Sequence, residues 1–210
     1  MQKTLLIAGI ALLMGLLTWM LFGWQPVDES AVSSSQIHHA AVPKGGDFTL
    51  QGQQGSVSLA DFRGQVVLLY FGYTWCPDIC PTTLSLFSRV LNELAPEELA
   101  QVQPIFVSVD PRRDDLARLK EYTEYFHPRL IGITGSDAEV ARAAALYGVA
   151  YRAVNPETDE NYAVDHSADT YLIDQQGGLV QRLPHGSSAE SLLNAIRGLI
   201  LSRKAQQKAG

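Results

Sequence analysis

The residues best suited to chemistry are two cysteines, Cys76 and Cys80, which stand in the segment CPDIC and are the only cysteines of the chain. Thiolates can form a disulfide, exchange electrons with other thiols or bind a soft metal ion. If a helix begins near Cys76, this spacing places both sulfurs one turn apart on one helical face. Pro77 suits the first turn of that helix, because its missing N–H would have no partner there. We therefore expect both sulfurs to act at one site.

A permanent structural disulfide is the simplest alternative for this pair. A bridge that closes so short a loop constrains the unfolded chain little, so it stabilises the fold less than a long-range bridge. The start of a helix also stabilises thiolates through its unpaired N–H groups and its dipole. A redox role or a metal site therefore explains the position better, and the residues alone leave both open.

If a metal binds, two thiolates without a second CxxC motif favour copper, above all Cu(I), over a four-ligand zinc site. A third ligand is then needed, and the chain has five histidines. His166 is the best candidate because it precedes a strand expected to enter the same sheet as the strand before the cysteines. Asp165 and Asp169 could hydrogen-bond its second ring nitrogen.

The remaining histidines fit other roles. His38 and His39 fall in a polar linker, and His185 falls in a turn. His127 is expected at a helix C-terminus, where a cation suits the dipole. The acidic stretch 157–165 is expected to be a solvated face.

The elements around these residues alternate between strands and helices. A hairpin is expected at 47–62, and the continuous apolar run VVLLYF at 66–71 suits a strand buried on both faces. Further strands are expected at 104–109, 130–135, 149–154, 170–174 and 179–183. Helices are expected in a segment that ends before Pro96, at 114–126, at 136–148 and from Ser187 onward. Capping patterns, Ser136 with Glu139 and Ser187 with Glu190, are expected to open the last two of these helices. This order predicts an α/β domain whose mixed central sheet is flanked by helices, with an N-terminal β-hairpin extension.

The N-terminal segment differs from the rest, because residues 4–24 are 21 residues without a charge. That length suits a transmembrane helix, and Trp19 and Trp24 suit an interfacial belt. A cleaved signal peptide is the alternative. We expect an anchor at 1–24 with a cytoplasmic N-terminus, a tether at 25–45, an exported domain at 46–202 and a tail at 203–210. The formal net charge of −6 argues against nucleic acid as a partner.

Three motifs together resemble a known family. YFGYTWCPDICPTTL, VSVDPRRDD and VDHSADTYLID, in this order, are similar to those of the Sco/SenC copper-binding assembly proteins. The resemblance covers roughly residues 46–200 and implies a thioredoxin-like fold behind one transmembrane helix. Asp110 and Pro111 match the DP turn of the family, which we interpret as structural.

The same resemblance implies a ligand set and a cargo. Copper, as Cu(I) or Cu(II) and one ion per chain, would bind to Cys76, Cys80 and His166. Asp78 matches the CPDxC pattern of the family, and it would lie behind the ligands together with Asp165.

By resemblance, the protein would be a metallochaperone rather than an enzyme, and it would deliver copper to the binuclear copper site of cytochrome c oxidase subunit II. It would lie in a bacterial inner membrane with its domain in the periplasm, and a copper donor or a thiol reductant would supply it.

The alternative is a membrane-anchored thiol-disulfide oxidoreductase that keeps the cysteines of that site reduced. Against it, such reductases usually have CxxC and a proline facing the pair, and no proline occurs at 157–183. A peroxidase ranks third, since Thr74 lies two residues before Cys76 instead of three.

Overall fold

The computed structural model describes residue 5 and residues 12–20, 43–154 and 162–209. The chain divides into two compact units, Met1–Ala40 and Ala41–Gly210.

Most of the expected membrane anchor lies outside the described residues. Residues 12–20 form a helix, and the side chain of Trp19 on it is exposed. Among the residues that the structure describes, no helix is both long and apolar enough to cross a membrane. The expected tether up to residue 42, with His38 and His39, and residues 155–161, which include the first part of the acidic stretch, also lie outside the described residues.

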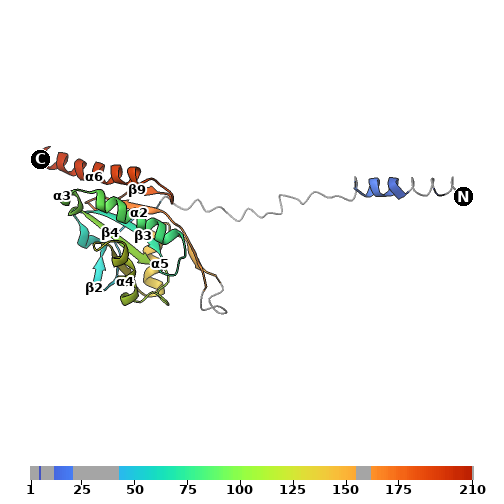
Figure 1. Ribbon diagram of the computed structural model, residues 1–210, viewed down its shortest axis with the longest axis horizontal. Helices are drawn as coiled ribbons and strands as arrows, with labels where there is room; N and C mark the ends of the chain where they lie inside the picture. The colour runs from blue at the N-terminus through green and yellow to red at the C-terminus, as the bar shows by residue number, and fades with distance from the viewer. Residues whose placement is uncertain (1–4, 6–11, 21–42, 155–161, 210) are drawn as a thin grey trace. The chain divides into compact units, whose positions relative to one another are not determined.

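A seven-stranded mixed sheet forms the centre of the second unit (Figure 1). Its strands are β1 (Thr49–Gly52), β2 (Gly55–Ser58), β3 (Val66–Gly72), β4 (Val102–Ser108), β5 (Ile131–Thr134), β8 (Thr170–Ile173) and β9 (Leu179–Leu183). They lie in the order β2-β1-β5-β4-β3-β8-β9. β3, β4 and β5 are parallel, whereas β8 is antiparallel to β3, and the expected β1–β2 hairpin extends one edge.

Both central strands are covered on their two faces. Every residue of β3 and of β4 is buried, which explains why β3 is a continuous apolar run and why residues 105–107 of β4 are apolar in succession instead of alternating with polar ones. Gly72 lies opposite Ser108 in the parallel register, so β3 and β4 end together. The cysteine segment leaves the sheet at that end.

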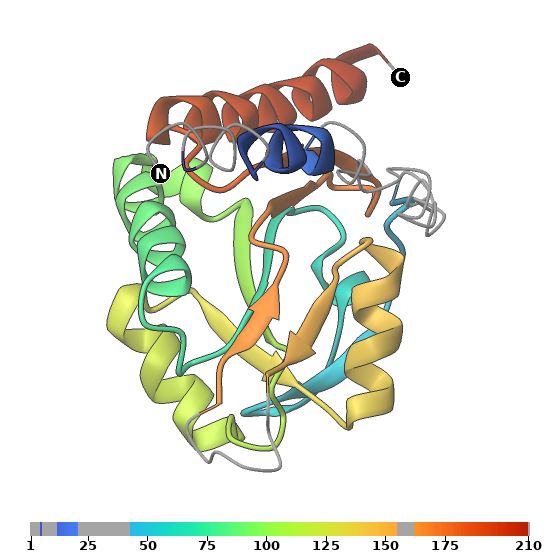
Figure 2. The same cartoon turned by 90° about the vertical axis from the view of Figure 1, so that its right-hand side faces the viewer.

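Helices cover both faces of the sheet. They are α2 (Ile79–Glu93), α3 (Pro96–Leu99), α4 (Leu116–Phe126), α5 (Asp137–Leu146) and α6 (Ala189–Ala209), with a short 3-10 helix, η2 (Leu59–Phe62). α2 and α4 lie on one side of the central strands and α5 lies on the other (Figure 2). α6 packs against α2 and β3. The units β3-α2-β4 and β8-β9-α6 thus give the predicted mixed sheet flanked by helices.

The N-terminal cap of α5 is the one predicted from the sequence, whereas the cap of α6 lies one residue later than predicted. Ser136 and Glu139 form the predicted capping box, in which each side chain accepts a hydrogen bond from the backbone N–H of the other. At α6 the capping residue is Ser188, whose hydroxyl oxygen accepts from Ser191 N at 3.1 Å. The predicted residue, Ser187, instead uses its hydroxyl to close the preceding turn.

A separate two-stranded sheet carries His166. β6 (Tyr151–Ala153) pairs antiparallel with β7 (Val164–His166), and Tyr151 lies opposite His166. The sequence predicted a strand at β6 but placed His166 in a loop. Because the pairing joins segments that residues 154–163 separate, no local pattern signals it.

The last residues of the expected tether pack on the domain. Gly45 N donates a hydrogen bond to Leu146 O at 3.1 Å, and Tyr147 Oη donates to Gly46 O at 2.9 Å. Gly45 has a φ of 67°, a conformation that costs glycine little. These contacts tie residues before β1 to the end of α5.

Candidate metal centre

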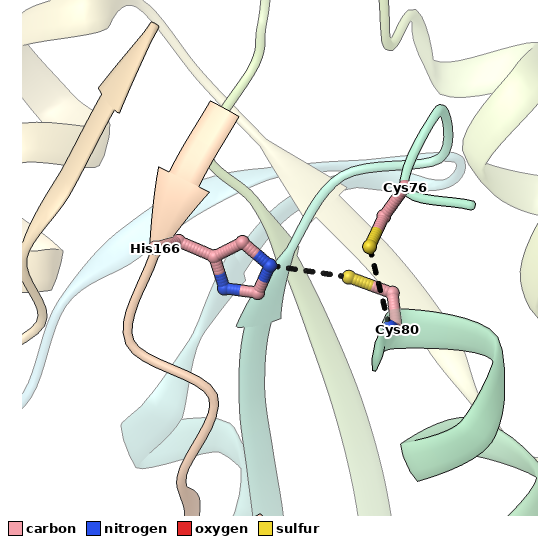
Figure 3. Close-up of side chains that lie close together, drawn as sticks. All are labelled: Cys76, Cys80 and His166. Carbon is pink, nitrogen blue, oxygen red and sulfur yellow. Dashed lines mark hydrogen bonds between the residues drawn. The ribbon is translucent and has the colours of Figure 1, made fainter. Parts of the chain in front are cut away.

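Three side chains predicted as metal ligands converge at the end of β3 (Figure 3). The ligand atoms of Cys76, Cys80 and His166 all lie within 4.8 Å of one another. His166 Nε2 lies 3.4 Å from Cys80 Sγ, and Cys76 Sγ accepts a hydrogen bond from Cys80 N at 3.4 Å. Both cysteines are free thiols.

The helix that carries the second cysteine begins later than predicted. α2 starts at Ile79, so Cys80 lies in its first turn while Cys76 and Pro77 precede it. The cause is a tight turn after β3, in which Cys76 N donates to Tyr73 O at 3.3 Å. The sulfurs therefore meet because this turn folds Cys76 over the start of the helix, where its sulfur satisfies an otherwise unpaired N–H.

The two thiols differ in burial and acidity. Cys80 is fully buried and Cys76 is half-buried. A hydrogen bond donated by the Cys80 thiol lowers the pKa of Cys76, outweighing the effect of burial, and His166 and backbone N–H groups lower it further. The same hydrogen bond, followed by burial, raises the pKa of Cys80. Cys76 is therefore the more acidic of the two sulfurs, and Cys80 keeps its proton to higher pH.

The buried sulfur of Cys80 is tightly packed against its neighbours. A Cβ atom at Gly72 would lie 2.6 Å from Cys80 Sγ and 2.9 Å from Phe106 Cε2, so glycine is required at the end of β3. Tyr70 Oη donates to Cys80 Sγ at 3.8 Å, and burial raises the pKa of Tyr70, which keeps it a neutral donor. Sequence reasoning missed both residues, although a glycine ending an apolar strand signals close approach.

His166 presents its Nε2 to the sulfurs. Its Nδ1 lies 2.9 Å from Ser167 O, and a carbonyl oxygen can only accept, so Nδ1 carries the proton. Nε2 is then the nitrogen whose lone pair, in the neutral ring, is available to a metal ion. The rings of Tyr70 and Tyr73 meet the imidazole edge-on, with centroids 6.2 and 5.8 Å away.

The two carboxylates expected behind the ligands do not contact them. Asp165 is exposed and forms a salt bridge with Arg152 at 3.2 Å, because alternate residues of β7 face opposite sides and His166 takes the inner one. The neighbouring carbonyl holds the imidazole instead. Asp78 has an exposed side chain and supports Cys76 through its backbone N–H.

The other described histidines stay apart from this site. Burial, followed by the charge of Arg129, lowers the pKa of His127, so it is not the cation expected at the end of α4. Its Nδ1 accepts from Arg129 N at 3.1 Å. His185 is exposed, and its Nδ1 lies 3.2 Å from Thr83 Oγ1. Neither joins a metal-binding group within the part of the chain that the structure describes.

A buried carboxylate fixes the cysteine turn from behind. Asp114 accepts hydrogen bonds from Thr74 N at 2.9 Å, from Thr74 Oγ1 at 2.6 Å and from Ser108 Oγ at 2.6 Å. Its side chain is fully buried, and this desolvation raises its pKa despite the hydrogen bonds. Arg118 lies over Trp75, with 4.4 Å between the guanidinium carbon and the ring centre. The turn before Cys76 is thus attached to both β4 and α4.

Comparison with known proteins agrees with this geometry. The SCO1/SenC family model matches residues 37–201. The mitochondrial SCO2 homologue of Mus musculus is 45% identical over 163 residues, which are 77% of this chain and 64% of that protein. The chain covers between 61% and 64% of the length of this relative and of its bovine and human counterparts.

Solved structures give the same result. Yeast Sco1, crystallised with copper bound, is 36% identical, with a TM-score of 0.68 over 76% of this chain and 89% of that one. BsSco, a member of the Sco family of cytochrome c oxidase assembly proteins in which a disulfide switch was identified, is 25% identical, with a TM-score of 0.59 over 76% of this chain and 94% of that one. This chain, with its paired thiols and facing imidazole, belongs to the SCO1/SenC family.

Proposed function

We propose that this protein is a copper metallochaperone that binds one copper ion through Cys76, Cys80 and His166. The observation that carries the proposal is the convergence of two sulfurs and an imidazole nitrogen within 4.8 Å. Yeast Sco1, which carries copper in its crystal structure, supports the choice of metal. Soft thiolates suit Cu(I), and the imidazole makes Cu(II) acceptable as well.

The proposed recipient is the binuclear copper site of cytochrome c oxidase subunit II. Membership of the SCO1/SenC family and the relation to BsSco support a role in assembling that enzyme. The half-buried Cys76 is the ligand that incoming groups of a recipient can reach first, while Cys80 lies deeper. We further propose that residues 1–24 anchor the protein in a bacterial inner membrane with the domain in the periplasm, where a donor supplies copper.

The difference between the thiols favours a second function, reduction of a partner disulfide. The Cys76 thiolate would attack the disulfide and form a mixed disulfide, and Cys80 would then displace it. The products are a Cys76–Cys80 disulfide and two partner thiols, so this chain gives up two electrons and the proton of Cys80, and the second partner thiol takes its proton from water. The switch identified in BsSco supports this alternative.

A copper titration tests the two functions. Reduced full-length protein is titrated anaerobically with Cu(I) and with Cu(II) against a competing chelator, together with the variants Cys76→Ser, Cys80→Ser and His166→Ala. We expect one copper per chain, loss of tight Cu(I) binding in each cysteine variant and weakened Cu(II) binding in His166→Ala. The control His185→Ala changes an exposed histidine outside the site and should bind as the unchanged protein does.

Weak copper binding that is unchanged in all three ligand variants would overturn the chaperone proposal. Turnover of a disulfide substrate by the same protein, lost in Cys76→Ser, would then establish the reductase.

A further inference from the structure

A cluster of three residues holds the hairpin that carries His166. Tyr162 Oη donates to Asp110 Oδ1 at 2.7 Å, and Arg113 Nε donates to Asp110 Oδ2 at 2.6 Å. The guanidinium carbon of Arg113 lies 3.6 Å from the centre of the Tyr162 ring. Asp110 is 4% exposed and Tyr162 is 7% exposed, so these bonds are shielded from water. We call these three residues the Asp110 cluster.

The same arginine also contacts the cysteine turn. Its guanidinium carbon lies 5.8 Å from the centre of the Tyr73 ring and 5.7 Å from that of Trp75, the residue before Cys76. The ring of Tyr73 in turn meets the imidazole of His166 edge-on. Arg113 therefore joins the two parts of the metal centre, the cysteine turn and the histidine hairpin.

The hairpin needs such a support. β7 is three residues long and lies in a two-stranded sheet with β6, an arrangement that is marginally stable in water by itself. It places Val164 in the core, while Asp165 faces solvent. His166 ends this short strand, so small movements of the hairpin change its distance from the sulfurs.

We propose that the Asp110 cluster positions His166 against the cysteine pair. Asp110, expected to be a turn residue alone, holds Tyr162 with one oxygen and Arg113 with the other, and Tyr162 lies four residues before the histidine. The three are positioning residues, since none supplies a ligand atom. The inference rests on the proposed copper binding and assigns a role within it.

The first test compares Tyr162→Phe with Tyr125→Phe in the full-length protein. Tyr162→Phe removes the hydroxyl but keeps the ring that Arg113 covers, and Tyr125, 84% exposed on α4, is the matched control. Partners that orient metal-bound histidines change metal affinity by roughly 10–100-fold. We expect Tyr162→Phe to weaken Cu(II) binding about tenfold, to weaken thiolate-dominated Cu(I) binding less, and Tyr125→Phe to leave both unchanged.

The same substitution in a His166→Ala background separates positioning from general destabilisation. If the cluster acts through His166, Tyr162→Phe causes no further loss of Cu(II) affinity once the imidazole is gone. An equal loss in both backgrounds, or unchanged affinity in Tyr162→Phe alone, overturns the proposal.

A third measurement needs no copper. Amide hydrogen exchange of residues 164–166 in the metal-free protein should be faster in Tyr162→Phe and in Asp110→Asn, and unchanged in Tyr125→Phe. Unchanged exchange in both cluster variants contradicts the positioning role. If the unchanged protein binds no copper through His166, the proposed function fails, and this exchange result still decides whether the cluster holds the hairpin.

Discussion

The two cysteines look equivalent in the sequence, yet the fold places them in different environments. Cys76 lies in a half-buried turn beside helix N–H groups, and Cys80 lies fully buried beneath it, against Gly72 and Tyr70. The result is a single proton retained by the deeper sulfur. A metal ion that takes both sulfurs has to displace that proton.

Copper loading should therefore release about one proton near neutral pH, since the pKa of Cys76 is lowered and that of Cys80 is raised. Because binding releases a proton, affinity rises with pH, and the dissociation constant should fall about tenfold per unit between pH 6 and 8. Calorimetric titration in buffers of different ionisation enthalpy measures the proton count. An affinity independent of pH would contradict the assignment of the sulfurs as ligands.

Between elements, the carboxylate of Asp114 is the main link from the cysteine turn to the sheet and to α4. It accepts hydrogen bonds from one backbone N–H and two hydroxyls in a place that water does not reach. Removing an acceptor from buried donors costs more than the hydrogen bonds themselves contribute. The next residue, Asp115, instead caps α4 at the surface, where its side chain accepts from Arg118 N.

Asp114→Ala should lower the free energy of unfolding by about 3 kcal/mol, because three buried donors lose their acceptor. Asp115→Ala, a matched control one residue away, should cost about 1 kcal/mol as the loss of an exposed N-cap. Urea unfolding followed by circular dichroism compares the two. Equal costs would mean that the buried network contributes no more than a helix cap.

The sequence predicted the strands and helices well where the signal is local. The apolar run of β3 and the capping pair Ser136 and Glu139 act within a few residues. The late start of α2 depends on a turn with no strong residue signature, and the β6–β7 pairing joins distant segments. The imidazole of His166 is held by a backbone carbonyl, which any residue type can supply. The sequence therefore indicated the neighbouring carboxylate of Asp165 wrongly.

Across the molecule, the packed domain includes residues before the first strand. Gly45 and Gly46 form hydrogen bonds with the end of α5, and the described core lies from Leu50 to Ile200. The residues that hold the metal centre and its supports all belong to this unit. The unit Ala41–Gly210 therefore contains the described core, these hydrogen bonds and the metal centre.

A fragment of residues 41–210 should fold and keep the thiol chemistry of the full chain. A fragment of residues 47–210 loses both hydrogen bonds to α5, so it should melt roughly 2–8 °C lower, as expected for a loss of about 1–2 kcal/mol. Thermal unfolding followed by circular dichroism makes the comparison. Equal melting temperatures would show that residues 41–46 add no stability.

The wide separation of the ligands along the chain links the metal centre to the order of folding. Cys80 and His166 are 86 positions apart, and β4, α4, β5 and α5 lie between them. Contacts between such distant segments form late, after their loops have closed. A chain that has not finished folding can offer the two thiols to a metal ion, but it does not yet hold the imidazole beside them. A metal ion held by all three side chains therefore marks a molecule that has completed its folding.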